Sequence, residues 1–206
     1  MRMSTVHLLV FDGMADWEPA FAIASIHNPQ FQLRPGRFRI QTAARSLAPV
    51  KTMGGVRILP DVTIDEVSPA QSSLLILPGG QSWENGGNLE ALERALAFVD
   101  AGVPVAAICA ATLALARTGL LDDRLHTSND AAYLASSGYR GARFYRNVPA
   151  ITDSNVITAS GLAPIEFARE ISRLLELYAP ATLEAWYSLY KHGDAKAFYD
   201  MAAAAA

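Results

Sequence analysis

Short apolar runs that end abruptly in small turn residues restrict this chain to very few folds. They span residues 6–11, 73–77, 103–108 and 156–158, and the turns that follow them contain Asp12-Gly13, Gly79-Gly80, Cys109 and Ser160-Gly161. Runs of this length without polar alternation are typical of strands that are buried on both faces of a parallel sheet. Because the carboxyl ends of parallel strands share one edge, we expect the four turns to meet there.

Segments with helical periodicity alternate with these runs. The predicted helices cover residues 17–26, 89–101, 109–117 and 164–178. Residues 38–43 alternate like a further strand, and residues 50–59 are predicted to form a hairpin around Gly54-Gly55. Alternating strands and helices predict an α/β three-layer sandwich, in which helices cover both faces of a mostly parallel, flavodoxin-like sheet.

Length and composition favour one globular domain followed by a helical extension. The chain has 206 residues, of which 51% are hydrophobic and only 18% are charged, as expected for a sheet covered on both faces. We assign residues 1–178 to the α/β domain. Residues 179–206 contain aromatic side chains such as Trp186 and Tyr190 among helix formers, and we expect them to pack as helices on the same domain or on a second subunit.

Charge and hydropathy argue against several partners and compartments. A formal net charge of -3 offers no electrostatic basis for binding nucleic acid or an anionic membrane. A membrane span needs about 20 consecutive apolar residues, and the longest apolar stretch falls short of that. No signal-peptide pattern is visible, and Cys109 is the only cysteine, so it has no intramolecular disulfide partner. We therefore expect a cytoplasmic protein.

Cys109 lies where a predicted strand passes into a predicted helix. Free amides at a helix N-terminus stabilise a thiolate, which would lower the pKa of the thiol and make it a nucleophile. The alternative is a small buried hydrophobe in an alanine-rich core junction. Glu18 stands in the first turn of another predicted helix, where a carboxylate is also favoured by the helix dipole alone. These patterns by themselves leave both alternatives open.

Taken together, the motifs resemble a known family. The resemblance rests on the segment from Val6 to Glu18 and on Leu75-Ile76-Leu77-Pro78-Gly79-Gly80, Ala107-Ile108-Cys109-Ala110 and Ile157-Thr158-Ala159-Ser160-Gly161. In this order and spacing, over about residues 5–178, the chain resembles the ThiJ/PfpI superfamily, which includes the parkinsonism-associated protein deglycase and has the class I glutamine amidotransferase-like fold. The resemblance implies a nucleophile elbow, a reactive Cys109 contacted by Glu18, no cofactor, and a homodimer.

Further site residues are expected around that pair. A carboxyl group donates a hydrogen bond to a thiolate only while it is protonated, so Glu18 should be buried enough to raise its pKa. The backbone N–H groups of Gly80 and Ala110, next to the turn glycine Gly79, are the expected donors to an oxyanion or a sulfinate. Asp16 is expected either to point into the site or to favour the helix start. No residue spacing typical of a metal site is present.

Departures from the family's patterns reduce the number of activities that this chain is expected to have. Family proteases resembling PfpI carry histidine directly after the cysteine, where this chain has Ala110, and glutamine amidotransferases carry a histidine near the position of Glu166 that is absent here. The glyoxalase and deglycase branch has a histidine where this chain has Asn129, which we expect at the oxyanion or substrate site, and His126 lies three residues earlier. His126 is a candidate general base if a bulge redirects it, or a strand-end histidine bonded to backbone.

Three functions follow from these features. The first is a cofactor-independent enzyme of the hydrolase or lyase class, in which Cys109 adds to a small electrophile such as a 2-oxoaldehyde, a glycated adduct or an isocyanide. The second is an oxidative-stress sensor or protective protein whose Cys109 is oxidised to a sulfinate held by Glu18. The third is a structural or binding scaffold that uses the aromatic C-terminal segment as a partner surface.

Overall fold

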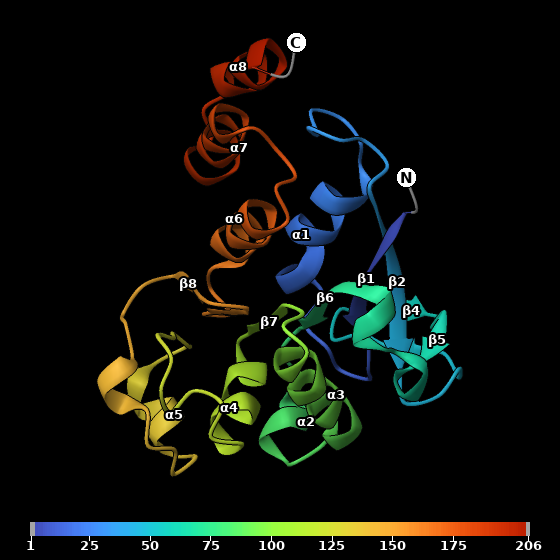
Figure 1. The fold of residues 1–206 in the computed structure, drawn as a ribbon, viewed down its shortest axis with the longest axis vertical. Helices are drawn as coiled ribbons and strands as arrows, with labels where there is room; N and C mark the ends of the chain where they lie inside the picture. The colour runs from blue at the N-terminus through green and yellow to red at the C-terminus, as the bar shows by residue number, and fades with distance from the viewer. Residues whose placement is uncertain (1–2, 205–206) are drawn as a thin grey trace.

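A seven-stranded sheet forms the centre of the computed structural model, which describes residues 3–204 (Figure 1). The strand order is β5-β2-β1-β6-β7-β9-β8. The strands are β1 (Ser4–Leu9), β2 (Phe38–Ala44), β5 (Val62–Thr63), β6 (Ser72–Leu77), β7 (Val105–Ile108), β8 (Ala150–Asp153) and β9 (Val156–Ala159). All pairings are parallel except that of β8 with β9. Residues 1–2 and 205–206, which the sequence assigns to the ends of the two segments, lie outside the described part.

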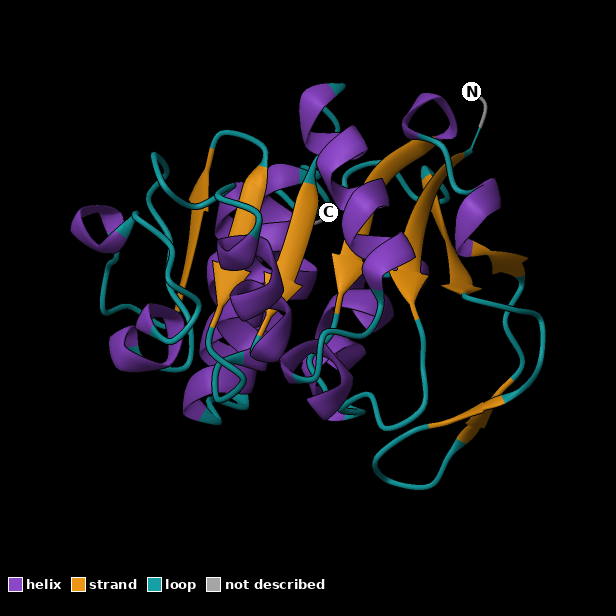
Figure 2. Cartoon of the chain, turned by 90° about the horizontal axis from the view of Figure 1, so that it is seen from below, coloured by secondary structure: helices purple, strands orange, loops and turns teal. Residues whose placement is uncertain are grey.

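Helices cover both faces of this sheet, which confirms the predicted three-layer α/β sandwich (Figures 1 and 2). On one side α1 (Trp17–His27) packs along α6 (Pro164–Leu174). The other side carries α2 (Gln81–Glu84), α3 (Leu89–Asp100) and α4 (Ala110–Arg117), with α5 (Ala131–Ala135) beside α4. Helix α6 ends earlier than the predicted residue 178, because Glu176 has a φ of 50° that does not continue a helix.

The buried strands place their carboxyl ends along one edge. Residues Leu74 to Leu77 of β6 and Val105 to Ile108 of β7 are all 0% exposed, as expected for central strands covered on both faces. Since β1, β6, β7 and β9 run in the same direction, the turns after them lie side by side. The edge predicted from the sequence therefore exists, and it holds Cys109.

A small hairpin lies over this edge, set apart from the main sheet (Figure 2). It consists of β3 (Val50–Lys51) and β4 (Arg57–Ile58), paired antiparallel as predicted. The turn after β1 holds it, since Lys51 N–H donates to Asp12 at 2.7 Å and Gly54 N–H donates to Asp16 at 2.6 Å. The hairpin tip is thus fixed next to the start of α1.

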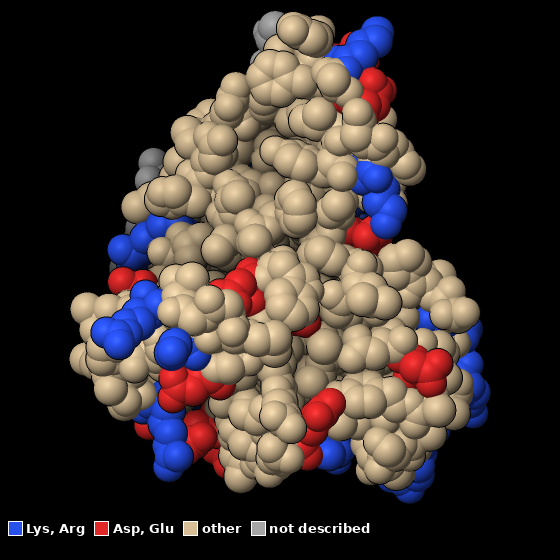
Figure 3. Space-filling model, turned by 180° about the vertical axis from the view of Figure 1, so that it is seen from behind, with Lys and Arg blue, Asp and Glu red and all other residues tan. Residues whose placement is uncertain are grey.

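The C-terminal helices pack on the same chain. Helix α7 (Pro180–His192) lies on α6, and α8 (Lys196–Ala204) lies on α7. Trp186 is buried, with its ring edge-on to Phe21 of α1 at 6.3 Å, and Tyr190 contacts Phe21 at 5.3 Å. From behind, the surface over these helices is largely uncharged, with charged side chains towards its edges (Figure 3). No helix within residues 3–204 combines the length and apolar character needed to cross a membrane.

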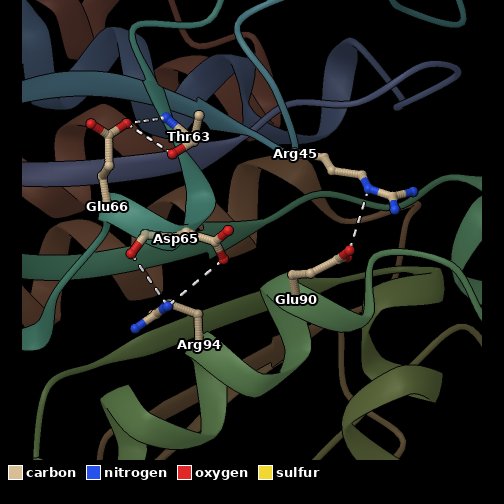
Figure 4. A network of polar contacts seen from close by, with 6 residues as sticks. All are labelled: Arg45, Thr63, Asp65, Glu66, Glu90 and Arg94. Atoms are coloured by element: carbon tan, nitrogen blue, oxygen red, sulfur yellow. Dashed lines mark hydrogen bonds and ion pairs between the residues drawn. The ribbon is translucent and has the colours of Figure 1, made fainter.

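Polar contacts fasten the short β5 edge of the sheet to α3 (Figure 4). They involve the 3-10 helix η1 (Ile64–Glu66), while the other 3-10 helices are η2 (Pro69–Gln71) and η3 (Ala142–Phe144). Thr63 and Glu66 form a capping box at η1, Arg94 of α3 donates to the backbone carbonyl of Asp65, and Arg45 pairs with Glu90 at 3.3 Å. Exposed pairs of this kind contribute about 0.2–1 kcal/mol each, so this edge depends mainly on the apolar core.

We predict that Trp186 anchors the C-terminal helices. Because the ring is buried against Phe21, Trp186→Ala should lower the free energy of unfolding by about 3 kcal/mol. Tyr199→Ala is the matched control, since Tyr199 is 72% exposed and should change stability by less than about 0.5 kcal/mol. Urea unfolding followed by tryptophan fluorescence and circular dichroism measures both. Equal losses in the two variants would contradict this role of the buried ring.

Candidate active site

Cys109 occupies a sharp turn between β7 and α4. Its φ of 59° and ψ of -127° are unusual for a residue with a side chain, and such conformations cost about 1–3 kcal/mol. Neighbouring residues hold the turn: Cys109 N–H donates to the Ala159 carbonyl at 3.0 Å, and the Thr112 hydroxyl donates to the Cys109 carbonyl at 2.5 Å. The turn is therefore a strained elbow of the kind that presents a nucleophile.

Glu18 lies in the first turn of α1 with its side chain fully buried. Its Oε2 accepts a hydrogen bond from the Gly79 N–H at 2.5 Å. Its Oε1 is buried and has no aligned hydrogen-bond partner among the described residues 3–204. A Cβ added at Gly161 would lie 3.1 Å from this oxygen and 2.9 Å from Cys109 Sγ. Glu18 and the thiol therefore line one small space.

Two glycines leave this space open. A Cβ at Gly79 would lie 2.6 Å from Cys109 Cβ and 2.8 Å from Glu18 Oε2, closer than packed atoms can approach. Gly161 closes the space from the turn after β9 in the same way. The turns after β6 and β9 therefore have to lack side chains at these positions if the carboxyl group and the thiol are to be neighbours.

Burial controls the titration of Glu18. It raises the pKa of the carboxyl group to about 7, although the Gly79 amide and the nearby Cys109 side chain act in the opposite direction. Glu18 therefore exchanges a proton near neutral pH, where an exposed glutamate is fully ionised.

The thiol responds to the same surroundings. Burial, followed by the negative charge of Glu18, raises the pKa of Cys109 to about 11, and hydrogen bonds from Asn129 and the Ala110 amide lower it only in part. The prediction of a lowered pKa from the helix N-terminus is therefore wrong, because desolvation and a neighbouring carboxylate outweigh the helix amides. The two groups titrate as a coupled pair, in which the thiol is protonated while Glu18 is charged.

Asn129 is a further side chain, besides Glu18, that lies at the Cys109 thiol. Its Nδ2 lies 3.3 Å from Cys109 Sγ, and its Oδ1 accepts a hydrogen bond from the Gly161 N–H at 2.9 Å. The amide thus connects the sulfur to the turn after β9.

The structure does not bring His126 to the thiol. Its ring is buried, with Nδ1 at 2.7 Å from the Arg124 carbonyl and Nε2 at 3.0 Å from the Tyr139 hydroxyl. Burial is also the main reason that its pKa is lowered. With both ring nitrogens engaged elsewhere, His126 matches the strand-end alternative, in which a histidine bonds to backbone.

The other residues predicted for the site, which are Asp16, Gly79, Gly80 and Ala110, each make different contacts. Asp16 points to the hairpin: burial tends to raise the pKa of its carboxyl group, but hydrogen bonds with Thr52 and Gly54 lower it overall. The Gly79 amide is already bonded to Glu18. The Ala110 amide is directed at the thiol, and a Cβ at Gly80 would lie 2.7 Å from the Phe11 ring. Gly80 therefore packs closely in the turn after β6.

A cleft of about 270 Å³ opens beside the thiol. It is lined by Ala15, Trp17, Glu18, Met53, Gly80, Gln81, Glu84, Cys109 and Ala110. Met53, Gln81 and Glu84 could not be assigned to the site from the sequence, because they come from a hairpin tip and a short helix without informative periodicity. Within the described part of the chain, no group of three or more His, Cys, Asp or Glu side chains is placed to hold a metal ion.

A strained cysteine elbow beside a buried carboxyl group, at the carboxyl edge of a parallel sheet, defines a class of α/β proteins with a nucleophile elbow. The sequence model of one such family, the DJ-1/PfpI family, matches residues 4–174 of this chain. The chain therefore belongs to the DJ-1/PfpI family, which confirms the resemblance found in the sequence.

Individual relatives cover between about two thirds and nearly all of the chain. "Uncharacterized protease YoaZ" of Bacillus subtilis is 37% identical over 204 residues, covering 98% of this chain and 97% of the relative. The crystal structure of a thiJ/pfpI family protein from Bacillus anthracis has a TM-score of 0.91 and 38% identity, covering 99% of both chains. "Glutathione-independent glyoxalase DJR-1.2" of Caenorhabditis elegans is 29% identical, covering 68% of this chain and 75% of the relative.

We predict that Glu18→Gln lowers the pKa of the Cys109 thiol. The ionised carboxylate raises that pKa, and a neutral amide of the same shape removes the charge, so the value should fall below 11 toward its ordinary 9.0. The rate of iodoacetamide alkylation at pH 8 should rise about tenfold, because the thiolate is the reactive form. Alkylation rates over a pH series, read by intact mass, test this. Glu93→Gln, on the exposed side of α3, should match the wild type, and an unchanged or higher thiol pKa in Glu18→Gln would contradict the coupling.

Proposed function

We propose that the protein is a cofactor-independent cysteine enzyme that adds the Cys109 thiol to a small electrophilic carbon, with 2-oxoaldehydes as the preferred class. The observation that carries the proposal is the buried Glu18 carboxyl group beside the thiol, with a pKa raised to about 7. A general base works best when its pKa is close to the working pH. Glu18 therefore supplies the proton acceptor that the thiol, with its raised pKa, requires.

The first step follows from these positions. As Sγ attacks the aldehyde carbon, the S–C bond forms, the thiol proton moves to Glu18, and the carbonyl π electrons move to oxygen. The amides of Ala110 and Gly80 donate to this oxyanion in the proposed complex, and Asn129 keeps the sulfur in place from its other side. Glu18 then returns the proton to the oxygen, which gives a hemithioacetal without any change in oxidation state.

The completed reaction needs no external oxidant. In a 2-oxoaldehyde the aldehyde carbon is oxidised while the neighbouring ketone carbon is reduced, and water releases a 2-hydroxy acid from Cys109. Glu18 is the side chain beside the sulfur that can carry the proton between these carbons. The glyoxalase name of a relative that covers two thirds of this chain supports this choice. Glycated adducts and isocyanides are alternative electrophiles for the same first step.

A protease activity has less support. The chain shares 37% identity with a relative named as an uncharacterized protease, yet Ala110 stands where family proteases resembling PfpI carry histidine. Neither Asn129 nor the engaged His126 provides an acid that could protonate the leaving amine. We further propose that the enzyme is a cytoplasmic homodimer, in keeping with the sequence and with the family.

Turnover of methylglyoxal tests the proposal. Cys109→Ser should lower kcat/KM at least about 1000-fold, because an alcohol is a far weaker nucleophile at neutral pH. Asn129→Ala should cost about 10- to 100-fold through loss of the contact to sulfur, and Asn28→Ala, on the exposed end of α1, should match the wild type. The assay follows loss of methylglyoxal and formation of lactate. Wild-type rates in Cys109→Ser would refute the proposed nucleophile.

A further inference from the structure

The cleft beside Cys109 carries an asymmetric charge. Its lining residues include two carboxyl groups, Glu18 and Glu84, and no lysine, arginine or histidine. Glu18 is buried at the thiol, whereas Glu84 is an exposed residue of α2. A ligand that reaches Cys109 therefore passes a carboxylate and meets no cation among these lining residues.

Glu84 is held in place by a side chain of α5. The Tyr133 hydroxyl of the α5 segment donates to Glu84 Oε1 at 2.9 Å. Burial raises the pKa of Tyr133, with further contributions from Glu84 and from the charge of Cys109. Tyr133 therefore remains a protonated donor. Glu84 and Cys109 line the same cleft, so the charge of Glu84 lies on the approach to the reacting sulfur.

Arg117 is the cation near this pair, but its nitrogens have other partners. Its two terminal nitrogens donate to the backbone carbonyls of Trp83 at 2.7 Å and Glu84 at 3.2 Å. The guanidinium group caps the end of α2 and does not line the cleft. It therefore does not provide the paired contact that a substrate carboxylate or phosphate requires.

The rest of the cleft suits apolar substituents. Trp17 and Met53 line it from α1 and the hairpin, and these side chains are 49% and 56% exposed. Trp17 is fixed by its indole N–H, which donates to the Gly161 carbonyl at 3.2 Å. An apolar group next to the electrophilic carbon would cover these side chains and gain about 25 cal/mol for each Å² of apolar surface removed from water.

From this arrangement we infer that Glu84 is a specificity-determining residue, which excludes anionic electrophiles and selects neutral or cationic ones with a small apolar substituent. The inference rests on the proposed function only in taking Cys109 as the reacting group. The amide of Ala110 accommodates negative charge that develops on the carbonyl oxygen at the reacting centre, whereas a permanent carboxylate elsewhere on the molecule would lie against Glu84. Neutral oxoaldehydes are therefore substrates, and oxo acids are excluded.

A pair of thiol reagents that differ in charge tests this directly, since the chain has one cysteine. The ratio of alkylation rates for iodoacetamide and iodoacetate is measured on the full-length protein and on N-acetylcysteine amide, which has no carboxylate, at the same pH and low salt. In the protein the ratio should exceed that of the free thiol by about tenfold. The excess should shrink when salt is raised, because the Debye length falls.

Glu84→Gln keeps the size of the side chain and an acceptor for Tyr133 but removes the charge, so the ratio should return to within about threefold of the free thiol. Glu93→Gln, outside the cleft, should retain the wild-type ratio. A wild-type ratio equal to that of the free thiol, or an undiminished ratio in Glu84→Gln, would overturn the inference. Because the assay modifies the thiol and does not require turnover, its result is independent of whether methylglyoxal is a substrate.

Discussion

The contact between the Glu18 carboxyl group and the Cys109 thiol is the interaction on which the rest of the site depends. It exists because four turns meet at one edge of the sheet and because Gly79 and Gly161 leave room there, where a Cβ would overlap the sulfur or a carboxylate oxygen. Burial then raises the pKa of Glu18 to about 7, and the same burial raises the pKa of the Cys109 thiol. The charge of Glu18, the space left by the two glycines and the strained turn at Cys109 therefore all affect how the thiol proton is held.

The fold supports this contact through rigid elements. The strained turn at Cys109 is held by the Ala159 carbonyl and by Thr112, whose hydroxyl also lies 2.6 Å from that of Ser128. Asn129 connects the thiol to the next turn, and Asp16 fastens the hairpin that brings Met53 to the cleft. Elements far apart in the sequence therefore position Glu18 and Cys109, and side chains of a short helix and a hairpin tip line the cleft beside them.

Much of the fold and part of the site could be predicted from the sequence. The buried runs predicted the parallel sheet and the edge where Cys109 lies, since strand direction follows from βα alternation. The pairing of Glu18 with the thiol came from family resemblance. The direction of the thiol pKa could not be predicted, because desolvation depends on tertiary packing. The places of His126 and Asn129 depend on an irregular segment, and Glu84 lies on a helix too short to have a period.

The titration of the Glu18 carboxyl group tests the central claim most directly. In protein labelled with ¹³C at glutamate carboxyl carbons, the Glu18 resonance is the one missing from the spectrum of Glu18→Gln, and its chemical shift is followed with pH. We expect a midpoint of about 7, compared with an ordinary value of 4.5. A midpoint at the ordinary value would show that Glu18 is an exposed or fully compensated carboxylate, and would contradict its role as the base that receives the thiol proton.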